Sequence, residues 1–162
     1  MNISALDSSH LVVTYPDPGR VEMMTIDGRV IDARDNQKTG NYLFQYPNYI
    51  AISNRRGIYV SDLTTRTITQ MDRTLHITQI FTSPMLTSPY GIVSVGTDQL
   101  LVADKDSDSI VVLNPTSGTV TPLLGQADGI QQPWAVAWCP ASKKLYVGSW
   151  GRHTPVSVFC LK

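Results

Sequence analysis

Residues 47–62 read Pro47-Asn-Tyr-Ile-Ala-Ile-Ser-Asn-Arg-Arg-Gly-Ile-Tyr-Val-Ser-Asp62, a pattern that recurs along the chain. It returns as Pro89-Tyr-Gly-Ile-Val-Ser-Val-Gly-Thr-Asp-Gln-Leu-Leu-Val-Ala-Asp104 and as Pro133-Trp-Ala-Val-Ala-Trp-Cys-Pro-Ala-Ser-Lys-Lys-Leu-Tyr-Val-Gly-Ser149. The three prolines are 42 and 44 residues apart, and a fainter first copy runs from Ile3 to Thr14. Four copies therefore fill the chain, and a repeat of this length indicates an array of similar structural units.

Each copy has the composition of a four-stranded antiparallel meander. A short apolar run precedes a polar turn and a second, β-branched run, and a third run follows after about seven polar or glycine-containing residues, a spacing typical of hairpins. Turn residues such as Asp27-Gly28 then lead to a fourth strand. Repeated meanders of this size predict an all-β fold, a β-propeller of about four four-stranded blades near residues 1–45, 46–87, 88–131 and 132–162. Helical solenoids are excluded, because no window has sustained helical spacing of apolar residues.

The repeat resembles a known family. Pro47-Asn-Tyr-Ile-Ala-Ile, Gly57-Ile-Tyr-Val-Ser-Asp62 and Ile68-Thr-Gln-Met71 are similar to the NHL repeat, which runs Pro-x-Gly-Ile-Ala-Val-Asp, Gly-x-Ile-Tyr-Val-Ala-Asp and Asn-x-Arg-Ile-x-Val-Phe. The family's Asn and Arg before the third strand are mostly lost, since only Arg20 stands at the expected place. Arg66 is one position early, and Ser109 replaces the arginine in the third copy.

The end of the chain, from Leu145-Tyr-Val-Gly-Ser-Trp-Gly-Arg152 to Lys162, is similar to the last blade of the propeller in tripartite-motif ubiquitin ligases. This resemblance implies substrate or partner binding within a ligase. Two cysteines and three histidines are too few for a RING domain, so ligase activity would have to reside in an N-terminal part outside this sequence. Family propellers usually have six blades, and the fourth copy here stops at its third strand. We therefore expect a fragment of a six-bladed propeller.

Composition gives no sign of a nucleic-acid or membrane protein. With 13 basic and 13 acidic side chains, the formal net charge is zero. The chain start lacks the features of a signal peptide, and no apolar run has the length of a spanning helix. We therefore expect a cytoplasmic protein. Cys139 and Cys160 lie in apolar surroundings, which predicts buried free thiols, with a disulfide as the alternative because the two are expected in neighbouring strands.

No catalytic motif is present, so the sequence predicts neither an enzyme nor a cofactor, metal or small-molecule substrate. The three histidines fall at different positions of their copies and are expected at the surface: His10, His76 and His153. Asp104, Asp106 and Asp108 alternate as calcium ligands do, but their loop lacks the glycine and glutamate of an EF-hand, which favours a solvated turn over a calcium site. Asp62 and Asp104 each end a strand, where a bond to the following loop is expected.

The candidate binding surface is formed by the loops between second and third strands and by the links into first strands, because loops commonly carry function. Aromatic residues and arginines there suit protein contacts as well as stacking of single-stranded bases. The predicted partner-binding residues are Tyr15, Arg20, Arg66, Lys105, Trp150, Arg152 and His153. For Tyr49, Tyr90 and Trp134, packing between blades is the favoured interpretation. The aspartates in these loops favour a protein partner over the alternative, RNA, and a metal-dependent propeller hydrolase or lyase is the third possibility.

Overall fold

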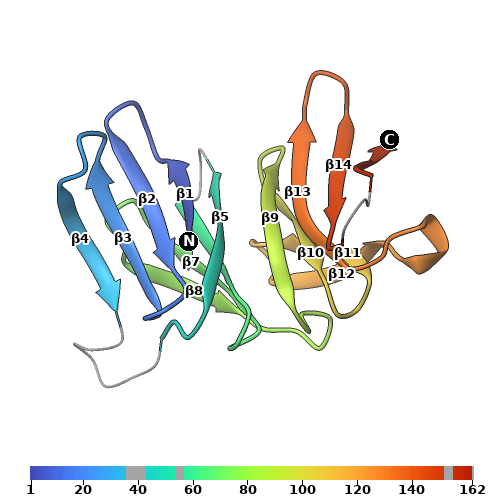
Figure 1. Ribbon diagram of the computed structural model, residues 1–162, viewed down its shortest axis with the longest axis horizontal. Helices are drawn as coiled ribbons and strands as arrows, with labels where there is room; N and C mark the ends of the chain where they lie inside the picture. The colour runs from blue at the N-terminus through green and yellow to red at the C-terminus, as the bar shows by residue number, and fades with distance from the viewer. Residues whose placement is uncertain (36–42, 54–56, 152–154, 162) are drawn as a thin grey trace. The chain divides into compact units, whose positions relative to one another are not determined.

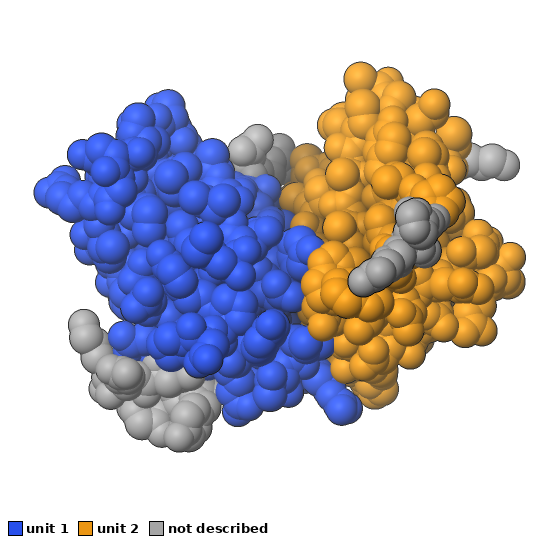
Figure 2. All heavy atoms as spheres, viewed as in Figure 1, with its two compact units in different colours: residues 1–82 blue, residues 83–162 orange. Residues whose placement is uncertain are grey.

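The computed structural model describes residues 1–35, 43–53, 57–151 and 155–161. Within these ranges the chain forms fifteen strands in four antiparallel sheets, together with one short 3₁₀ helix, η1 (Gln126–Asp128) (Figure 1). The all-β prediction is therefore confirmed. The chain divides into two compact units, residues 1–82 and 83–162 (Figure 2). Among the described residues, no helix has the length and apolar character needed to cross a membrane.

Unit 1 contains two four-stranded sheets in which strands follow one another in chain order. Sheet 1 consists of β1 (Asn2–Ala5), β2 (His10–Tyr15), β3 (Arg20–Thr25) and β4 (Val30–Asp35). Sheet 2 consists of β5 (Pro47–Ser53), β6 (Gly57–Asp62), β7 (Thr67–Met71) and β8 (Ile77–Phe81). The second strands β2 and β6 include β-branched residues, Val12, Val13, Thr14, Ile58 and Val60, and the turn residues between strands allow the hairpins that produce this meander.

The core of unit 1 lies between its two sheets. Val12, Val21 and Met23 of sheet 1 pack against Ile58 and Val60 of sheet 2. Because successive residues of a strand point to opposite faces, alternate residues of β3 (Val21 and Met23) and of β6 (Ile58 and Val60) enter this core. The Thr14 hydroxyl also donates to the carbonyl oxygen of Asn48 at 2.8 Å, which ties the two sheets together beside the core.

Unit 2 repeats this arrangement with a smaller second sheet. Sheet 3 consists of β9 (Pro89–Val95), β10 (Gln99–Asp104), β11 (Ser109–Asn114) and β12 (Thr119–Leu124). Sheet 4 has three described strands, β13 (Pro133–Cys139), β14 (Lys144–Ser149) and β15 (Ser157–Cys160). The core between them includes Leu101, Ala103, Leu145 and Val147. Gly91 lets the sheets approach closely, because a Cβ there would lie 2.8 Å from the Cα of Ala135.

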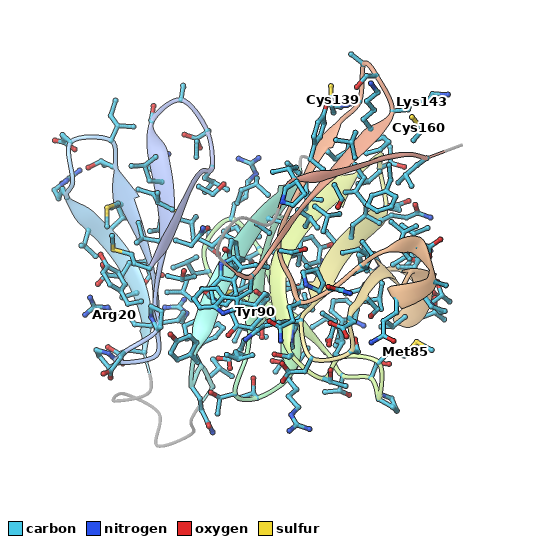
Figure 3. All side chains as sticks on the ribbon, turned by 45° about the vertical axis from the view of Figure 1, so that its right-hand side comes forward. Arg20, Met85, Tyr90, Cys139, Lys143 and Cys160 are labelled. Atoms are coloured by element: carbon cyan, nitrogen blue, oxygen red, sulfur yellow. The ribbon has the colours of Figure 1, made fainter. Side chains whose placement is uncertain are left out.

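The prediction of two buried thiols is wrong. Both cysteines are free, Cys139 is partly exposed and Cys160 is exposed (Figure 3). Both cysteines pair in register with Lys144, which directly precedes the core residue Leu145 in β14. Because neighbouring residues of a strand point to opposite faces, the two cysteines face away from the core. β14 also separates β13 from β15, so the two cysteines do not lie in neighbouring strands. The Ser142 side chain, by hydrogen bonding to the thiolate, lowers the pKa of Cys139.

Candidate partner-binding site

Three sheets share one backbone hydrogen bond at the end where the second strand finishes. The residue that follows the second strand donates its N–H to the carbonyl of the residue that precedes the first strand. The pairs are Leu63 to Tyr46 (3.2 Å), Lys105 to Ser88 (3.0 Å) and Trp150 to Gln132 (2.8 Å). We call this end of each sheet its corner: the last residue of the second strand, the loop after it and the link before the first strand. Lys105 and Trp150 therefore hold the same place in successive repeats.

Buried aspartates stabilise the corners of sheets 2 and 3. Asp62 is fully buried, and its carboxylate accepts four backbone hydrogen bonds of 2.8–3.0 Å, two from the preceding link and two from the following loop. Asp104 is also fully buried and accepts from the backbone N–H groups of Thr87 and Ser88 and from the hydroxyls of Thr87 and Ser107. The predicted bond to the backbone of the following loop is confirmed for Asp62, whereas Asp104 bonds to that loop through the Ser107 hydroxyl. Both carboxylates also hold the link before the first strand.

The alternating aspartates 104, 106 and 108 have different surroundings. Asp108 accepts hydrogen bonds from the Gln132 backbone N–H at 2.7 Å and from the Gln126 side chain at 2.6 Å. Both bonds lower the pKa of Asp108, and the bond from Gln132 has the larger effect. The prediction of a solvated turn is therefore wrong for Asp104, which is buried, whereas Asp106 is exposed and Asp108 is partly exposed while it bonds to Gln132 and Gln126.

Unit 2 has a stack of three aromatic rings at the corners of sheets 3 and 4. The ring centroids of Tyr90 and Trp134 are 4.2 Å apart with an interplanar angle of 32°. Those of Trp134 and Trp150 are 4.4 Å apart with an angle of 30°. Tyr90 is buried, Trp134 is partly buried, and Trp150 is 56% exposed. The stack therefore leads from the protein interior to the solvent, and Figure 3 labels its inner member, Tyr90.

The ammonium of Lys105 lies beside all three rings. Its Nζ is 5.5 Å from the centroid of Tyr90 and 5.6 Å from those of Trp134 and Trp150. In a straight stack the outer centroids would lie farther from the nitrogen than the middle one, so equal distances mean that the rings curve around the ammonium. Each contact is within the range of cation–π attraction. Among the described residues, no carboxylate forms an ion pair with Lys105.

A surface pocket adjoins the exposed end of this stack. Its volume is about 530 Å³, and it is lined by Trp134, Ser149, Trp150 and Gly151. One wall is thus aromatic, and the others are small residues that leave room for a ligand group. We call Tyr90, Trp134, Trp150 and Lys105 the aromatic cluster and treat the cluster with its pocket as the candidate site.

The corner of sheet 1 uses its cation differently. The Arg20 guanidinium lies 4.3 Å from the centroid of the Tyr15 ring, and its Nε is 3.1 Å from a carboxylate oxygen of Glu22. The Glu22 side chain is only 10% exposed, against 33% for Arg20. Burial raises the pKa of Tyr15, and the negative charge of Glu22 raises it further. Arg20, labelled in Figure 3, is therefore engaged within its own sheet.

The remaining predicted residues are scattered or lie outside the described ranges. Arg66 is exposed and has a positive φ of 57°. Arg152 and His153 lie outside the described residues. His10 bonds to Asp7 at 2.9 Å, and His76 bonds to the Thr74 hydroxyl at 2.8 Å, so each belongs to its own turn. No group of three or more potential metal ligands occurs among the described residues.

The structure brings together residues that the sequence assigned to two different roles. Lys105 and Trp150 are predicted contact residues, whereas Tyr90 and Trp134 are predicted packing residues, and all four form one cluster. The signal in the sequence was that Tyr90 and Trp134 both follow the repeat's proline, a position that neighbouring sheets place side by side. Glu22 was missed, because an acidic residue inside an otherwise apolar strand is not expected to be buried.

Comparisons with known proteins assign the fold. No protein-family model and no curated protein matches the sequence. Solved structures do match: a virginiamycin B lyase from Staphylococcus aureus (TM-score 0.73, 17% identity, 99% of this chain and 55% of that one), U3-55K (0.77, 17%, 99% and 48%) and the WD40 β-propeller domain of Doa1 (0.70, 12%, 91% and 46%). The predicted propeller fold is therefore confirmed, and the chain spans about half the length of these solved proteins. At such identities the likeness carries no function with it.

Proposed function

We propose that this chain is a protein-recognition segment of a β-propeller that binds its partner at the aromatic cluster. The observation that carries the proposal is the half-exposed Trp150, held in place by Trp134 and Lys105 at the rim of a pocket. Tryptophan and tyrosine dominate the binding energy of protein interfaces, especially where they are rigid and adjoin a pocket. A side chain of the partner would enter the pocket and pack on the open face of Trp150. The proposed role is non-catalytic.

The resemblance to NHL repeats supports a narrower form of this proposal. In that form the chain belongs to the propeller of a cytoplasmic tripartite-motif ubiquitin ligase, and the cluster recognises the ligase substrate. Two free cysteines, one of them exposed, fit a reducing compartment. WD40 propellers among the similar solved structures fit a binding scaffold.

RNA is the second candidate, because an exposed stacked aromatic ring can also hold a base. Charge argues against it. Lys105 shares its loop with Asp104, Asp106 and Asp108, and a net negative loop repels phosphates. The described histidines give no support to the hydrolase or lyase alternative, since His10 and His76 bond within separate turns.

A peptide selection tests the proposal. A random peptide library displayed on phage is selected against the intact chain, and recovered peptides are titrated against the unmodified chain, Trp150→Ala and the control Leu123→Ala, which removes an exposed side chain from β12. We expect Trp150→Ala to weaken binding at least about thirtyfold, as for an interface hot spot, and the control to have little effect. Peptides that bind all three equally would contradict the proposed site.

A single-stranded RNA oligonucleotide separates the two candidates. Fluorescence anisotropy at low and physiological salt should show only weak, salt-sensitive binding. Tight binding that persists at physiological salt and disappears in Trp150→Ala would favour RNA over a protein partner.

A further inference from the structure

The residue before the repeat's proline donates its backbone N–H to a carboxylate in sheets 2, 3 and 4. The pairs are Tyr46 to Asp62 (3.0 Å), Ser88 to Asp104 (3.0 Å) and Gln132 to Asp108 (2.7 Å). In sheets 2 and 3 the carboxylate ends the second strand of the same sheet. Asp108 instead belongs to the loop between β10 and β11 of sheet 3, so the link into sheet 4 is held by the neighbouring sheet.

The second strand of sheet 4 ends in a serine, Ser149, at the place of the corner aspartate. A neutral hydroxyl cannot replace a carboxylate, because hydrogen bonds to an ionised acceptor are roughly twice as strong as bonds between neutral groups. The Asp108 carboxylate supplies the charged acceptor from outside the sheet. Its second oxygen accepts from the Gln126 side chain at 2.6 Å, which fixes the orientation of the carboxylate.

The loop position of Asp108 also occurs in sheet 2, where Arg66 occupies it. Arg66 lies four residues after Asp62, as Asp108 lies four residues after Asp104, and the two have similar positive φ values of 57° and 49°. Both loops therefore present this residue in the same backbone conformation. Sheet 3 has its own aspartate for its link, and sheet 4 does not. The carboxylate thus occurs at this loop position before the sheet that lacks one.

Gln132 has a backbone conformation that depends on its hydrogen bonds. Its φ is +40°, a region that non-glycine residues seldom adopt, and residues before a proline favour extended backbone. Such a conformation persists where the surrounding structure holds it. Gln132 as a whole is exposed, so packing of its side chain contributes little. The bond to Asp108 and the bond to Trp150 are the contacts that hold it.

Two hydrogen bonds in series join Asp108 to the exposed member of the aromatic cluster. The Gln132 N–H donates to Asp108, and the Gln132 carbonyl accepts from the Trp150 N–H at 2.8 Å. The Asp108 N–H also donates to the carbonyl of Lys105 at 3.3 Å. Asp108 is therefore bonded directly to the backbone of Lys105 and through one residue to that of Trp150. Because Trp150 is 56% exposed, its place depends strongly on its backbone.

We propose that Asp108 is a positioning residue for the candidate binding site. Its carboxylate holds Gln132, and Gln132 holds Trp150 where its ring stacks on Trp134 and meets a partner. A loop of sheet 3 thus completes the corner of sheet 4. The effect on binding rests on the proposed function, whereas the effect on the position of Trp150 exists without a partner.

Near-ultraviolet circular dichroism of the intact chain tests the position of Trp150. The difference between the unmodified chain and Trp150→Ala defines the signal of the stacked indoles. Asp108→Gly removes the carboxylate, and glycine accepts the positive φ, so we expect this variant to lose most of that signal. Asp108→Asn keeps an oxygen that can accept from Gln132 and should retain most of it. The matched control Asp106→Gly, at an exposed carboxylate of the same loop, should retain all of it.

Titration of the peptides recovered in the selection tests the effect on binding, under conditions where far-ultraviolet circular dichroism shows every variant folded. We expect Asp108→Gly to weaken binding at least about tenfold, and Asp108→Asn and Asp106→Gly to weaken it less than about threefold. An equal loss in Asp106→Gly would overturn the proposal, because the charge of the loop would then account for it.

The two experiments separate this proposal from the proposed function. If Asp108→Gly keeps the spectrum and the affinity while Trp150→Ala loses both, Asp108 does not position Trp150, and the proposed function stands. If the peptides bind Trp150→Ala as tightly as the unmodified chain, the proposed function fails. The spectrum of Asp108→Gly then decides by itself whether Asp108 positions Trp150.

Discussion

The corners of sheets 2 and 3 differ from those of sheets 1 and 4 at the last residue of the second strand. Sheets 2 and 3 have Asp62 and Asp104 there, fully buried and with every described bond made to the chain itself. Sheet 1 has Tyr15, half-buried beneath a guanidinium, and sheet 4 has Ser149 at the wall of a pocket. The aspartate ties the loop after the second strand to the link before the first, and sheets 1 and 4 have no carboxylate in this place. The aromatic cluster joins the two kinds of corner, since Lys105 and Tyr90 come from sheet 3 and its exposed member Trp150 comes from sheet 4.

Removing a corner aspartate should have the largest effect. We expect Asp104→Asn to lower the free energy of unfolding by about 3–5 kcal/mol, because buried N–H donors of Thr87 and Ser88 would face an amide that cannot accept all their bonds. Urea unfolding monitored by circular dichroism measures this. Asp106→Asn, an exposed carboxylate in the same loop, is the matched control and should change stability by less than about 0.5 kcal/mol. Equal losses would show that the aspartate does not define the corner.

The second prediction tests whether the ion pair between Arg20 and Glu22 stabilises the corner of sheet 1. We expect Arg20→Met to lower the free energy of unfolding by about 2 kcal/mol, because Glu22 would stay buried without its partner. The loss should be smaller than for a fully buried pair, since the Arg20 side chain is one-third exposed. Adding Glu22→Gln should recover part of the loss. Urea unfolding of the two single variants and the double variant gives the coupling energy, and purely additive effects would mean that the ion pair contributes nothing.

Asp108 should contribute less to the free energy of unfolding, and its contribution should depend on pH. Because hydrogen bonds from Gln132 and Gln126 lower its pKa in the folded state, the carboxylate stabilises the fold above its ordinary pKa near 4, and this contribution is lost as the pH falls through the folded value. We expect Asp108→Asn to cost about 1 kcal/mol at pH 7. The difference in the free energy of unfolding between this variant and the unmodified chain should shrink below about pH 4. Urea midpoints at pH 7, 5 and 3.5 measure it, and a difference that does not vary with pH would contradict this role.

How much of this molecule the sequence predicts depends on whether a feature repeats. The repeated prolines and valines predicted the meanders and the all-β fold, and Asp62 and Asp104 were predicted to bond within their corners because they recur at a strand end. The aromatic cluster combines residues from four segments of the chain, which periodicity alone does not join. The cysteines were assigned to the core from apolar neighbours, but the face that a strand residue occupies depends on register, which local composition does not fix.

The smallest change in stability is expected at the residue proposed to matter most for binding. Trp150 is 56% exposed and stacks on Trp134, so Trp150→Ala should cost only about 1 kcal/mol in urea unfolding. Near-ultraviolet circular dichroism should nevertheless change, because the variant separates two stacked indoles. Peptides recovered in the selection should lose at least about thirtyfold in affinity. At the corner of sheet 4, which has no aspartate, removing a side chain would then change the free energy of unfolding little and the affinity for the peptides strongly. If Trp150→Ala instead destabilised the chain as much as Asp104→Asn, the aromatic cluster would be part of the core, and the contrast between the two kinds of corner would fail.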